Sequence, residues 1–408
     1  MAGVTVNLNL QGVAQNTGGG GIDTLVSIEN VFGTNFNDIL TGNGGDNMFS
    51  GLAGNDQLLG GGGNDTLNGG SGNDLLNGGT GSDTASYSVA KAGVKVNLNL
   101  AGAQNTGVGG IDTLLSIENL DGSRFNDVLT GNAGNNVLAG RDGNDLLNGG
   151  AGSDTASYRT ATAGVTVDLD LGGAQNTGGA GIDTLVSIEN VIGSSFNDTL
   201  HGGFEDNITI KGGAGNDLLT NSKSNDFTLD GEDGNDELIA VFAVGTLNGG
   251  NGNDTLRAVD GNYIVNGGAG NDVLVATGSH ARLNGGAGTD TLYETQTPDF
   301  SSGGAKFDYN AVSESLAGVG KDKIIGFNGK GSEFGNQIDL RDIDARPSVV
   351  GNQAFIWGGP FTEGHLQYVG GVLQGNLDGD AAAEFEIQLV GAPALFVQAR
   401  HLGSDILL

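Results

Sequence analysis

Large apolar residues recur every nine positions along much of the chain, and an Asp usually stands two positions before each. The repeating unit is Gly-Gly-x-Gly-x-Asp-x-Leu-x, as in residues 60–68 and 69–77. Glycines permit the positive φ angles of a tight turn, and Asp-x-Leu-x suits a short strand whose Leu side chain faces inward. The pattern therefore predicts a turn and a short strand in every unit.

The apolar and acidic positions follow different periods in the third run of repeats. Complete units begin at residues 231, 249, 267 and 285, which are 18 apart. The units between them keep the apolar position as Leu247, Val265 and Leu283 but lose the Asp. Two half-turns per coil explain this alternation. We expect an all-β, right-handed parallel β-roll with 18 residues per coil, in which each coil contacts only its neighbours.

A longer repeat is superimposed on the short one at residues 2–32, 92–121 and 163–192. Each copy opens with Ala-Gly-Val-x-Val-x-Leu-x-Leu and closes with Ser-Ile-Glu-Asn. We interpret these segments as longer coils of the same roll. Their Glu residues, Glu29, Glu118 and Glu189, are expected on a solvated strand face rather than at a metal.

Proline placement predicts a domain boundary. All four Pro lie at or beyond residue 298, and a Pro cannot donate to a strand ladder. Residues 1–297 therefore form the predicted roll, and residues 298–408 form a different, β-rich capping and secretion domain.

Composition excludes several classes of protein. The 408 residues include 79 Gly, no Cys and 48 Asp+Glu against 16 Lys+Arg, for a formal charge of −32. Nucleic-acid binding needs a basic face, disulfides need Cys, and no apolar run approaches the roughly 18 residues of a membrane span.

The acidic turns call for a hard cation. Stacked Asp residues 18 apart lie about one strand spacing from each other, and two such charges repel by roughly 3–4 kcal/mol at an effective dielectric near 20. Ca²⁺ takes six to eight oxygens and accepts backbone carbonyls, whereas Zn²⁺ prefers His or Cys. We expect about eight Ca²⁺ ions or more, one for each carboxylate pair. A roll held by protonated carboxylates is the physical alternative.

The nine-residue consensus resembles the RTX (repeats-in-toxin, hemolysin-type calcium-binding) family. In that family, calcium lies between turns 18 residues apart and is held by the Asp carboxylates and by turn carbonyls. The resemblance implies carboxylate ligands at Asp38, Asp56, Asp65, Asp74, Asp83, Asp127, Asp145, Asp154, Asp198, Asp217, Asp236, Asp254, Asp272 and Asp290. It implies backbone carbonyl ligands at Gly61, Gly63, Gly70, Gly72, Gly250, Gly252, Gly268 and Gly270. Two units carry Asn47 and Asn136 in place of Asp, so their sites are expected to be weaker.

The last hundred residues resemble the C-terminal region of serralysin-type secreted metallopeptidases. The similar stretches are residues 322–327, 336–344, 373–380 together with 384–387, and 405–408. The resemblance implies that this region caps the roll and that a type I secretion apparatus reads the C-terminus. Within it, the segment from Asn376 to Glu384 is similar to a small oxygen-ligand loop, with Ala381 where such a loop favours Gly.

No catalytic motif is recognisable. The sequence contains neither His-Glu-x-x-His nor Gly-x-Ser-x-Gly, so we expect a protein that is not an enzyme. No cleavable N-terminal signal is evident, and an extracellular or cell-surface location reached by type I export is expected. The first long repeat begins abruptly at Met1, which predicts that an N-terminal domain is missing.

The expected role is therefore that of a secreted calcium-binding protein with a structural, adhesive or matrix function. Its partners would be a cell-surface polysaccharide or another protein. The alternative is a folding and secretion module of an extracellular metallopeptidase, lipase or polysaccharide epimerase, with the catalytic domain outside this chain.

Overall fold

The computed structural model describes residues 2–278, 280–295, 304–317, 320–327, 336–347, 353–378, 380, 382–391, 393–395, 397 and 404–408. The protein is all-β over these residues, with one short 3-10 helix, η1 (Val312–Glu314). It folds as two compact units, Met1–Ser195 and Phe196–Leu408. The all-β prediction is confirmed.

The strands of the first unit are β1 (Thr5–Asn7), β2 (Ala14–Gly18), β3 (Gly21–Thr24), β4 (Asn30–Phe32), β5 (Ile39–Thr41), β6 (Met48–Ser50), β7 (Gln57–Gly62), β8 (Thr66–Asn68), β9 (Leu75–Thr80), β10 (Thr84–Ser86), β11 (Lys95–Asn97), β12 (Gln104–Gly107), β13 (Gly110–Leu115), β14 (Asn119–Asp121), β15 (Val128–Thr130), β16 (Val137–Ala139), β17 (Leu146–Asn148), β18 (Thr155–Ser157), β19 (Thr166–Asp168), β20 (Ala174–Gly178), β21 (Gly181–Val186) and β22 (Asn190–Ile192).

Most strands of the first unit stack in parallel on two faces of a roll. One face is the continuous run β4-β6-β8-β10-β14-β16-β18-β22, and the other consists of the sheets β1-β5-β7-β9-β13-β12 and β11-β15-β17-β21-β20. Leu40 pairs with Leu58, and Leu58 pairs with Leu76. These three inward-facing side chains are fully buried. The predicted coil of 18 residues and the parallel β-roll are therefore confirmed.

Each long repeat contains an antiparallel hairpin rather than only a longer coil. The hairpins are β2–β3, β12–β13 and β20–β21, and in the second copy Gly107 and Gly110 reverse the chain at positive φ. Strand β13 pairs with β9, and its hairpin partner β12 ends that sheet, whereas β11 pairs with β15 and starts the next. On the opposite face β10 pairs directly with β14. A long repeat thus interrupts one sheet and leaves the other continuous.

The strands of the second unit are β23 (Thr199–His201), β24 (Thr209–Ala214), β25 (Leu218–Ser222), β26 (Asn225–Asp233), β27 (Glu237–Val241), β28 (Val244–Asn251), β29 (Thr255–Val259), β30 (Asn262–Ala269), β31 (Val273–Thr277), β32 (His280–Ala287), β33 (Thr291–Thr295), β34 (Lys306–Asp308), β35 (Asp322–Ile325), β36 (Gln337–Asp339), β37 (Ile356–Trp357), β38 (His365–Val369), β39 (Val372–Asn376), β40 (Phe385–Leu389) and β41 (Ile406–Leu407).

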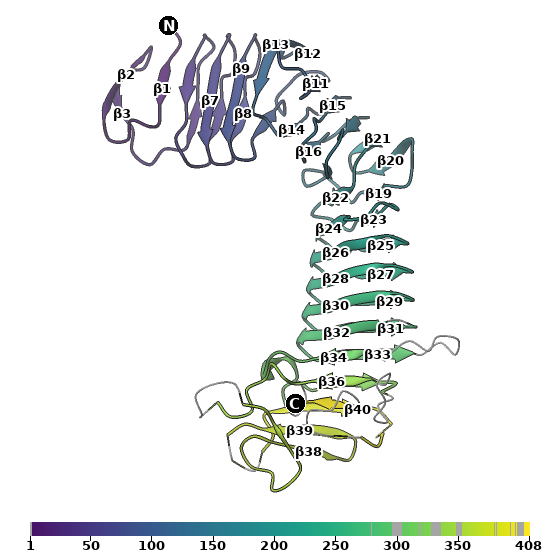
Figure 1. Ribbon diagram of the computed structural model, residues 1–408. Helices are drawn as coiled ribbons and strands as arrows, with labels where there is room; N and C mark the ends of the chain where they lie inside the picture. Colours follow the sequence, from purple (N-terminus) through teal and green to yellow (C-terminus); the bar gives the residue numbers. More distant parts are fainter. Residues whose placement is uncertain are drawn as a thin grey trace. The chain divides into compact units, whose positions relative to one another are not determined.

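The second unit is a regular stack that continues into the C-terminal region. Strands β25, β27, β29, β31 and β33 succeed one another as rungs of one sheet (Figure 1). Strand β35 pairs with β33, and β34 and β36 extend the opposite sheet. Strands β38, β39 and β40 form an antiparallel meander. The predicted boundary at residue 297 falls within residues 296–303, outside the described residues, and stays a prediction.

The stacked apolar residues form the core, so truncating one of them opens a cavity. We expect Leu247→Ala to lower the free energy of unfolding by about 2–5 kcal/mol, because Leu247 is fully buried. The control, Ile264→Ala on the adjacent strand β30, changes a side chain that is 48% exposed and should shift stability by about 0.5 kcal/mol or less. Urea unfolding of both variants in calcium measures the difference; equal losses would contradict the inward register.

Candidate metal-binding columns

Every predicted carboxylate ligand lies at the turn that precedes a strand, and every one is buried. Burial follows from the fold, since the residue two positions later points into the core. None is more than 3% exposed: Asp38, Asp56, Asp65, Asp74, Asp83, Asp127, Asp145, Asp154, Asp198, Asp217, Asp236, Asp254, Asp272 and Asp290. The structure thus brings the predicted residues together, while their role in binding calcium stays a prediction.

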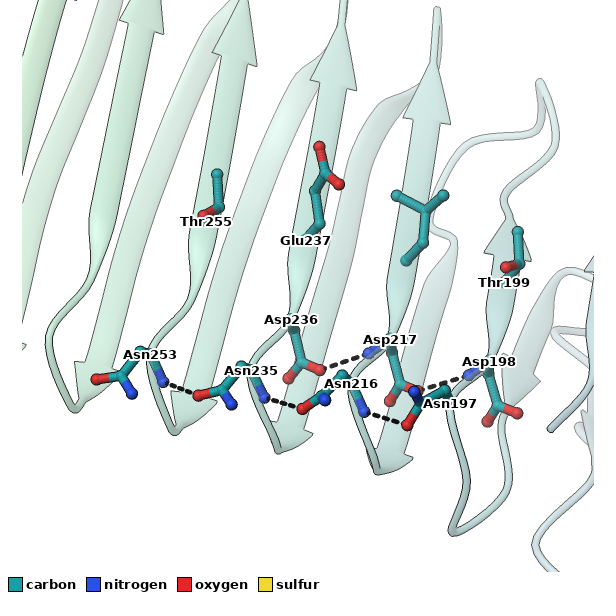
Figure 2. A pocket seen from close by; sticks show the side chains of 11 residues that line it. Asn197, Asp198, Thr199, Asn216, Asp217, Asn235, Asp236, Glu237, Asn253 and Thr255 are labelled. Atoms are coloured by element: carbon teal, nitrogen blue, oxygen red, sulfur yellow. Dashed lines mark hydrogen bonds between the residues drawn. The ribbon is translucent and has the colours of Figure 1, made fainter. Parts of the chain in front are cut away.

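Successive carboxylates are linked by a ladder of hydrogen bonds. The backbone N–H of each Asp donates to a carboxylate oxygen in the next coil, which is Oδ1 of the equivalent Asp except at Asp83 and Asp154, where a Glu Oε2 accepts. Asp56 Oδ1 accepts from Asp38 at 2.8 Å, and the distance is again 2.8 Å at every step from Asp198 to Asp290. Figure 2 shows two of these steps. One carboxylate oxygen of each Asp is therefore satisfied by the backbone.

The second oxygen has no hydrogen-bond partner at most of these positions. Leaving a buried polar atom unpaired costs about 1–3 kcal/mol, and more for a charged group. Among the described residues, twelve carboxylates have a buried, unpaired Oδ2: Asp56, Asp65, Asp74, Asp83, Asp145, Asp154, Asp217, Asp236, Asp254, Asp272, Asp290 and Asp322. A cation or a proton is needed to compensate these oxygens, and an all-oxygen donor set is the kind that calcium prefers.

Burial changes the acidity of these groups. It raises the pKa of Asp74 to about 7 and that of Asp145 to about 8, against the partial opposition of the backbone hydrogen bonds to each carboxylate. Burial likewise raises the pKa of Asp217 and Asp272 to about 7. Basic side chains pair with other carboxylates, as Arg341 does with Asp339 at 2.7 Å.

The glycine turns direct backbone carbonyls into the stack. The Gly61 carbonyl oxygen lies 2.1 Å from the point that a Cβ of Gly79 would occupy, and the Gly252 oxygen lies 1.6 Å from that point at Gly270. Gly79 and Gly270 also have positive φ. The carbonyls of Gly63, Gly72, Gly250, Gly268 and Gly270 face the next coil in the same way. No such contact places the predicted Gly70 carbonyl.

The acidic positions form four columns, each at the start of one sheet's strands. Column 1 contains Asp38, Asp56, Asp74 and Asp112. Column 2 contains Asp127, Asp145 and Asp183. Column 3 contains Asn47, Asp65, Asp83, Glu118, Asn136, Asp154 and Glu189. Column 4 contains Asp198, Asp217, Asp236, Asp254, Asp272, Asp290 and Asp322.

Three Asp members of the columns were missing from the predicted set. Asp112 and Asp183 come from the Ile-Asp-Thr-Leu segments of the long repeats, and Asp322 comes from the C-terminal region. Each stands two positions before an apolar residue, as in the nonapeptide. That Asp-x-apolar spacing was the available signal, but the glycines that normally precede it are incomplete.

The expected solvated face is wrong for Glu118 and Glu189. Glu118 Oε2 accepts the Asp83 N–H at 2.9 Å, and Glu189 Oε2 accepts the Asp154 N–H at 2.7 Å. Both side chains thus occupy the column place of a turn Asp. Glu29 lies differently, because its Oε2 accepts the side-chain amides of Asn43 and Asn47.

The two Asn substitutions replace an unpaired oxygen with a donor. Asn136 Nδ2 donates to the Glu118 carbonyl at 2.7 Å, and Asn47 Nδ2 donates to the Glu29 carbonyl at 3.2 Å. An amide is neutral and is already satisfied here, so neither position calls for a cation. This is the physical reason to expect weaker sites at these positions.

A second ladder runs beside the first at the preceding residue. The Asn216 N–H donates to Asn197 Oδ1 at 2.9 Å, and the Asn235 N–H donates to Asn216 Oδ1 at 2.8 Å (Figure 2). These side chains line an open cavity of about 520 Å³ together with Asp198, Asp217 and Asp236. The recurrent Asn-Asp pair therefore fixes the turns through two ladders, of which only the acidic one has unpaired oxygens.

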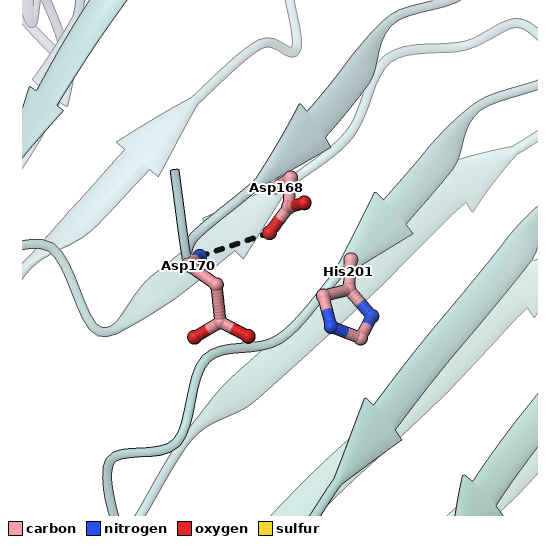
Figure 3. Close-up of side chains that lie close together, drawn as sticks. All are labelled: Asp168, Asp170 and His201. Atoms are coloured by element: carbon pink, nitrogen blue, oxygen red, sulfur yellow. Dashed lines mark hydrogen bonds between the residues drawn. The ribbon is translucent and has the colours of Figure 1, made fainter. Parts of the chain in front are cut away.

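The neighbouring acidic residues Asp168 and Asp170 are held together by a local turn. The Asp170 N–H donates to Asp168 Oδ1 at 2.9 Å (Figure 3), and the equivalent bond forms between Asn9 and Asn7 in the first long repeat. His201, also drawn there, belongs to the second unit, where its Nδ1 lies 2.7 Å from the Thr220 hydroxyl.

The C-terminal acidic loop is tied together by local hydrogen bonds. Asp378 and Glu384 lie close to Asp380, the Asp380 N–H donates to Asp378 Oδ1, and Asn376 Nδ2 donates to the Asp380 carbonyl. Ala381 lies outside the described residues.

In the part of the chain that the structure describes, no helix has the length and apolar character needed to cross a bilayer.

The fold and the columns define a class of protein, a parallel β-roll built to hold a series of oxygen-ligated cations. The comparisons name the family. The model of the RTX calcium-binding nonapeptide repeat matches residues 28–58, 50–85, 121–156, 192–227, 245–274 and 266–293. The chain therefore contains several copies of the RTX calcium-binding nonapeptide repeat. The search of curated proteins finds no match.

The matched segments do not include residues 86–120 or 157–191. These are the stretches that supply Asp112, Glu118, Asp183 and Glu189. The similarity of residues 298–408 to the serralysin C-terminal region stays a prediction.

Removing the negative charge of one column Asp should lower the number of bound Ca²⁺ ions. In Asp254→Asn the amide oxygen keeps the hydrogen bond from the Asp236 N–H, but the unpaired Oδ2 becomes an amide nitrogen, which repels a cation. We expect the loss of at least one bound Ca²⁺ ion, measured by equilibrium dialysis. The control, Asp233→Asn, alters an exposed Asp that accepts from Asn251 Nδ2 and should leave the count unchanged. Equal counts in both variants would refute the assignment.

The raised pKa values predict how the metal-free roll responds to pH. Its carboxylates bind protons up to about pH 7 or 8 when folded, as for Asp74 and Asp145, but only near pH 4 when unfolded. Between these limits the folded state holds more protons, so its stability falls as pH rises. In EDTA, the folded fraction measured by circular dichroism should increase when the pH is lowered from 8 to about 4.5. A folded fraction that rises with pH over this range would contradict the prediction.

Proposed function

We propose that this chain is a secreted protein that folds on binding calcium outside the cell and then acts as a structural or adhesive surface. The observation that carries the proposal is the series of buried carboxylates whose second oxygen has no hydrogen-bond partner. Without cations these groups oppose folding at neutral pH. With Ca²⁺ between them, they join neighbouring coils.

Calcium would be held by the Asp side chains of consecutive coils and by the turn carbonyls. A single site filled at one hundred times its dissociation constant adds about 2.7 kcal/mol to stability. A column of several such sites is therefore comparable with the whole net stability of a domain, about 5–15 kcal/mol. The ion supplies positive charge and extra coordination, and the folded chain supplies a stack of carboxylate and carbonyl oxygens.

The proposal couples folding to location. Extracellular calcium modules have dissociation constants of about 10⁻⁴–10⁻³ M, well above cytosolic free calcium. The chain would stay loosely folded inside the cell, which suits passage through a type I exporter, and would fold once outside. Proteins with RTX repeats are typically secreted, which supports this route.

In this proposal the chain acts by binding rather than by catalysis, and its partner is a cell-surface polysaccharide or another protein. The stacked turns present rows of Asn side chains and rigid coils, a surface suited to extended partners. The alternative role, a folding and secretion module joined to an extracellular enzyme, uses the same calcium-dependent folding. Binding of the calcium-loaded protein to polysaccharides and whole cells tests the adhesive role.

Calcium-dependent folding has a direct test at pH 7.5. We expect the β-sheet circular dichroism signal to appear on adding millimolar Ca²⁺ and to disappear with excess EDTA, because removing the ions exposes the carboxylate repulsion. Mg²⁺ at the same concentration is the control and should restore much less signal, since its tighter octahedral geometry suits a carbonyl-rich turn poorly. A β signal that is unaffected by chelation would overturn the proposal.

A further inference from the structure

The Ser-Ile-Glu-Asn segments reproduce the geometry of a nonapeptide turn with different residues. In an ordinary coil, the Asp65 Oδ2 and the Gly78 carbonyl oxygen of the next coil lie 2.1 and 2.6 Å from the point that a Cβ of Gly60 would occupy. At Gly78 the corresponding atoms are Asp83 Oδ2 at 2.4 Å and the Ser116 carbonyl oxygen at 2.3 Å. Ser116 thus takes the place of a turn Gly.

The Glu side chain takes the place of the turn Asp. Glu118 is half-buried, and its Oε2 accepts the Asp83 N–H at 2.9 Å. In the nonapeptide the Asp follows the first Gly by five positions, whereas Glu118 follows Ser116 by only two. The longer Glu side chain reaches the column from this shorter backbone path.

The segment is fixed against the preceding turn by several further contacts. The N–H groups of Glu118 and Asn119 both donate to the Asp83 carbonyl, at 3.1 and 2.8 Å. Asn119 Nδ2 donates to the Ser82 hydroxyl at 2.9 Å. Ser116 adopts a φ of 47°, in the left-handed region, which sets the direction of its carbonyl.

The second copy has the same arrangement. Asp154 Oδ2 and the Ser187 carbonyl oxygen lie 2.4 and 2.3 Å from the Cβ point of Gly149. Glu189 Oε2 accepts the Asp154 N–H at 2.7 Å, and Ser187 has a φ of 50°. Two copies of one sequence motif, 71 residues apart, therefore build the same set of oxygens.

An independent observation points to a ligand at each place. Asp83 and Asp154 are fully buried, and the Oδ2 of each has no hydrogen-bond partner. Each of these oxygens and the Ser carbonyl oxygen lie within 2.4 Å of the same point, the Cβ position of the turn Gly, so two electron-rich atoms face the same space. The facing Glu carboxylate adds a second negative charge.

We propose that each Ser-Ile-Glu-Asn segment completes a calcium site with the nonapeptide turn before it. One site joins Asp83 to Glu118 and the Ser116 carbonyl, and the other joins Asp154 to Glu189 and the Ser187 carbonyl. The proposal rests on the proposed calcium-dependent folding and extends it beyond the nonapeptides. The two ions clamp the second and third long repeats onto the roll at column 3.

The test counts calcium in the whole chain. Glu118→Gln and Glu189→Gln each keep an oxygen that accepts the Asp N–H but remove the charge. Each should lower the number of bound ions by one, and the double variant should lower it by two, as measured by equilibrium dialysis and metal analysis. The matched control is Glu29→Gln, because Glu29 accepts two Asn amides and no Asp N–H; it should bind as many ions as the wild type.

The outcomes separate this proposal from the proposed function. A double variant that binds as many ions as the Glu29→Gln control overturns the Ser-Ile-Glu-Asn sites, whereas a wild type that binds no calcium overturns calcium-dependent folding itself. If the variants fail to give the wild-type circular dichroism spectrum, a crystal structure of the calcium-loaded wild type decides. Anomalous density between Asp83 and Glu118 supports the site, and its absence there, with ions present in the nonapeptide turns, refutes it.

Discussion

The unpaired carboxylate oxygen is the constraint on which the rest of this structure depends. The 18-residue coil places an Asp at the start of each strand and buries it, and the backbone can satisfy only one of its two oxygens, as at Asp254. Because the coil repeats, these carboxylates form a column of like charges, and each charge repels its neighbours. The same repetition makes the remedy cooperative, because an ion shared by two coils stabilises both.

The ends of the columns show that protein groups can replace a cation where the stack stops. Asp38, the first member of column 1, receives the Thr34 N–H on Oδ2 at 2.6 Å, and Asp127 receives the Ser123 N–H in the same way in column 2. At the other end of column 1, Asp112 Oδ2 accepts the Thr106 and Tyr87 hydroxyls at 2.8 and 3.3 Å. In columns 1 and 2 the unpaired oxygens are thus confined to the inner members, Asp56, Asp74 and Asp145, where an ion would bind.

The regular part of the fold was predictable because its signals are local and repeated. Glycine turns, Asp-x-Leu strands and the 18-residue period are all visible in the sequence, and so are the buried positions such as Asp272. The hairpins of the long repeats and the role of Glu118 were not predictable. They depend on which coil a segment meets across 35 residues, and a Glu in an isolated Ser-Ile-Glu-Asn segment looks like any exposed acid.

The long repeats interrupt the roll on one side only, and this asymmetry explains the choice of Glu. On the side of column 1 the sheet ends at a hairpin, and hydroxyl groups close the column at Asp112. On the side of column 3, strand β10 pairs directly with β14. The sheet is continuous there, so the column must span the insertion as well. A hydroxyl cap there would end the acidic series at Asp83, whereas Glu118 supplies an acceptor for the Asp83 N–H and a second carboxylate facing Asp83, whose Oδ2 is unpaired. The insertion is therefore accommodated with the Asp83 N–H still paired, and Asn136 joins the next coil through its bond to the Glu118 carbonyl.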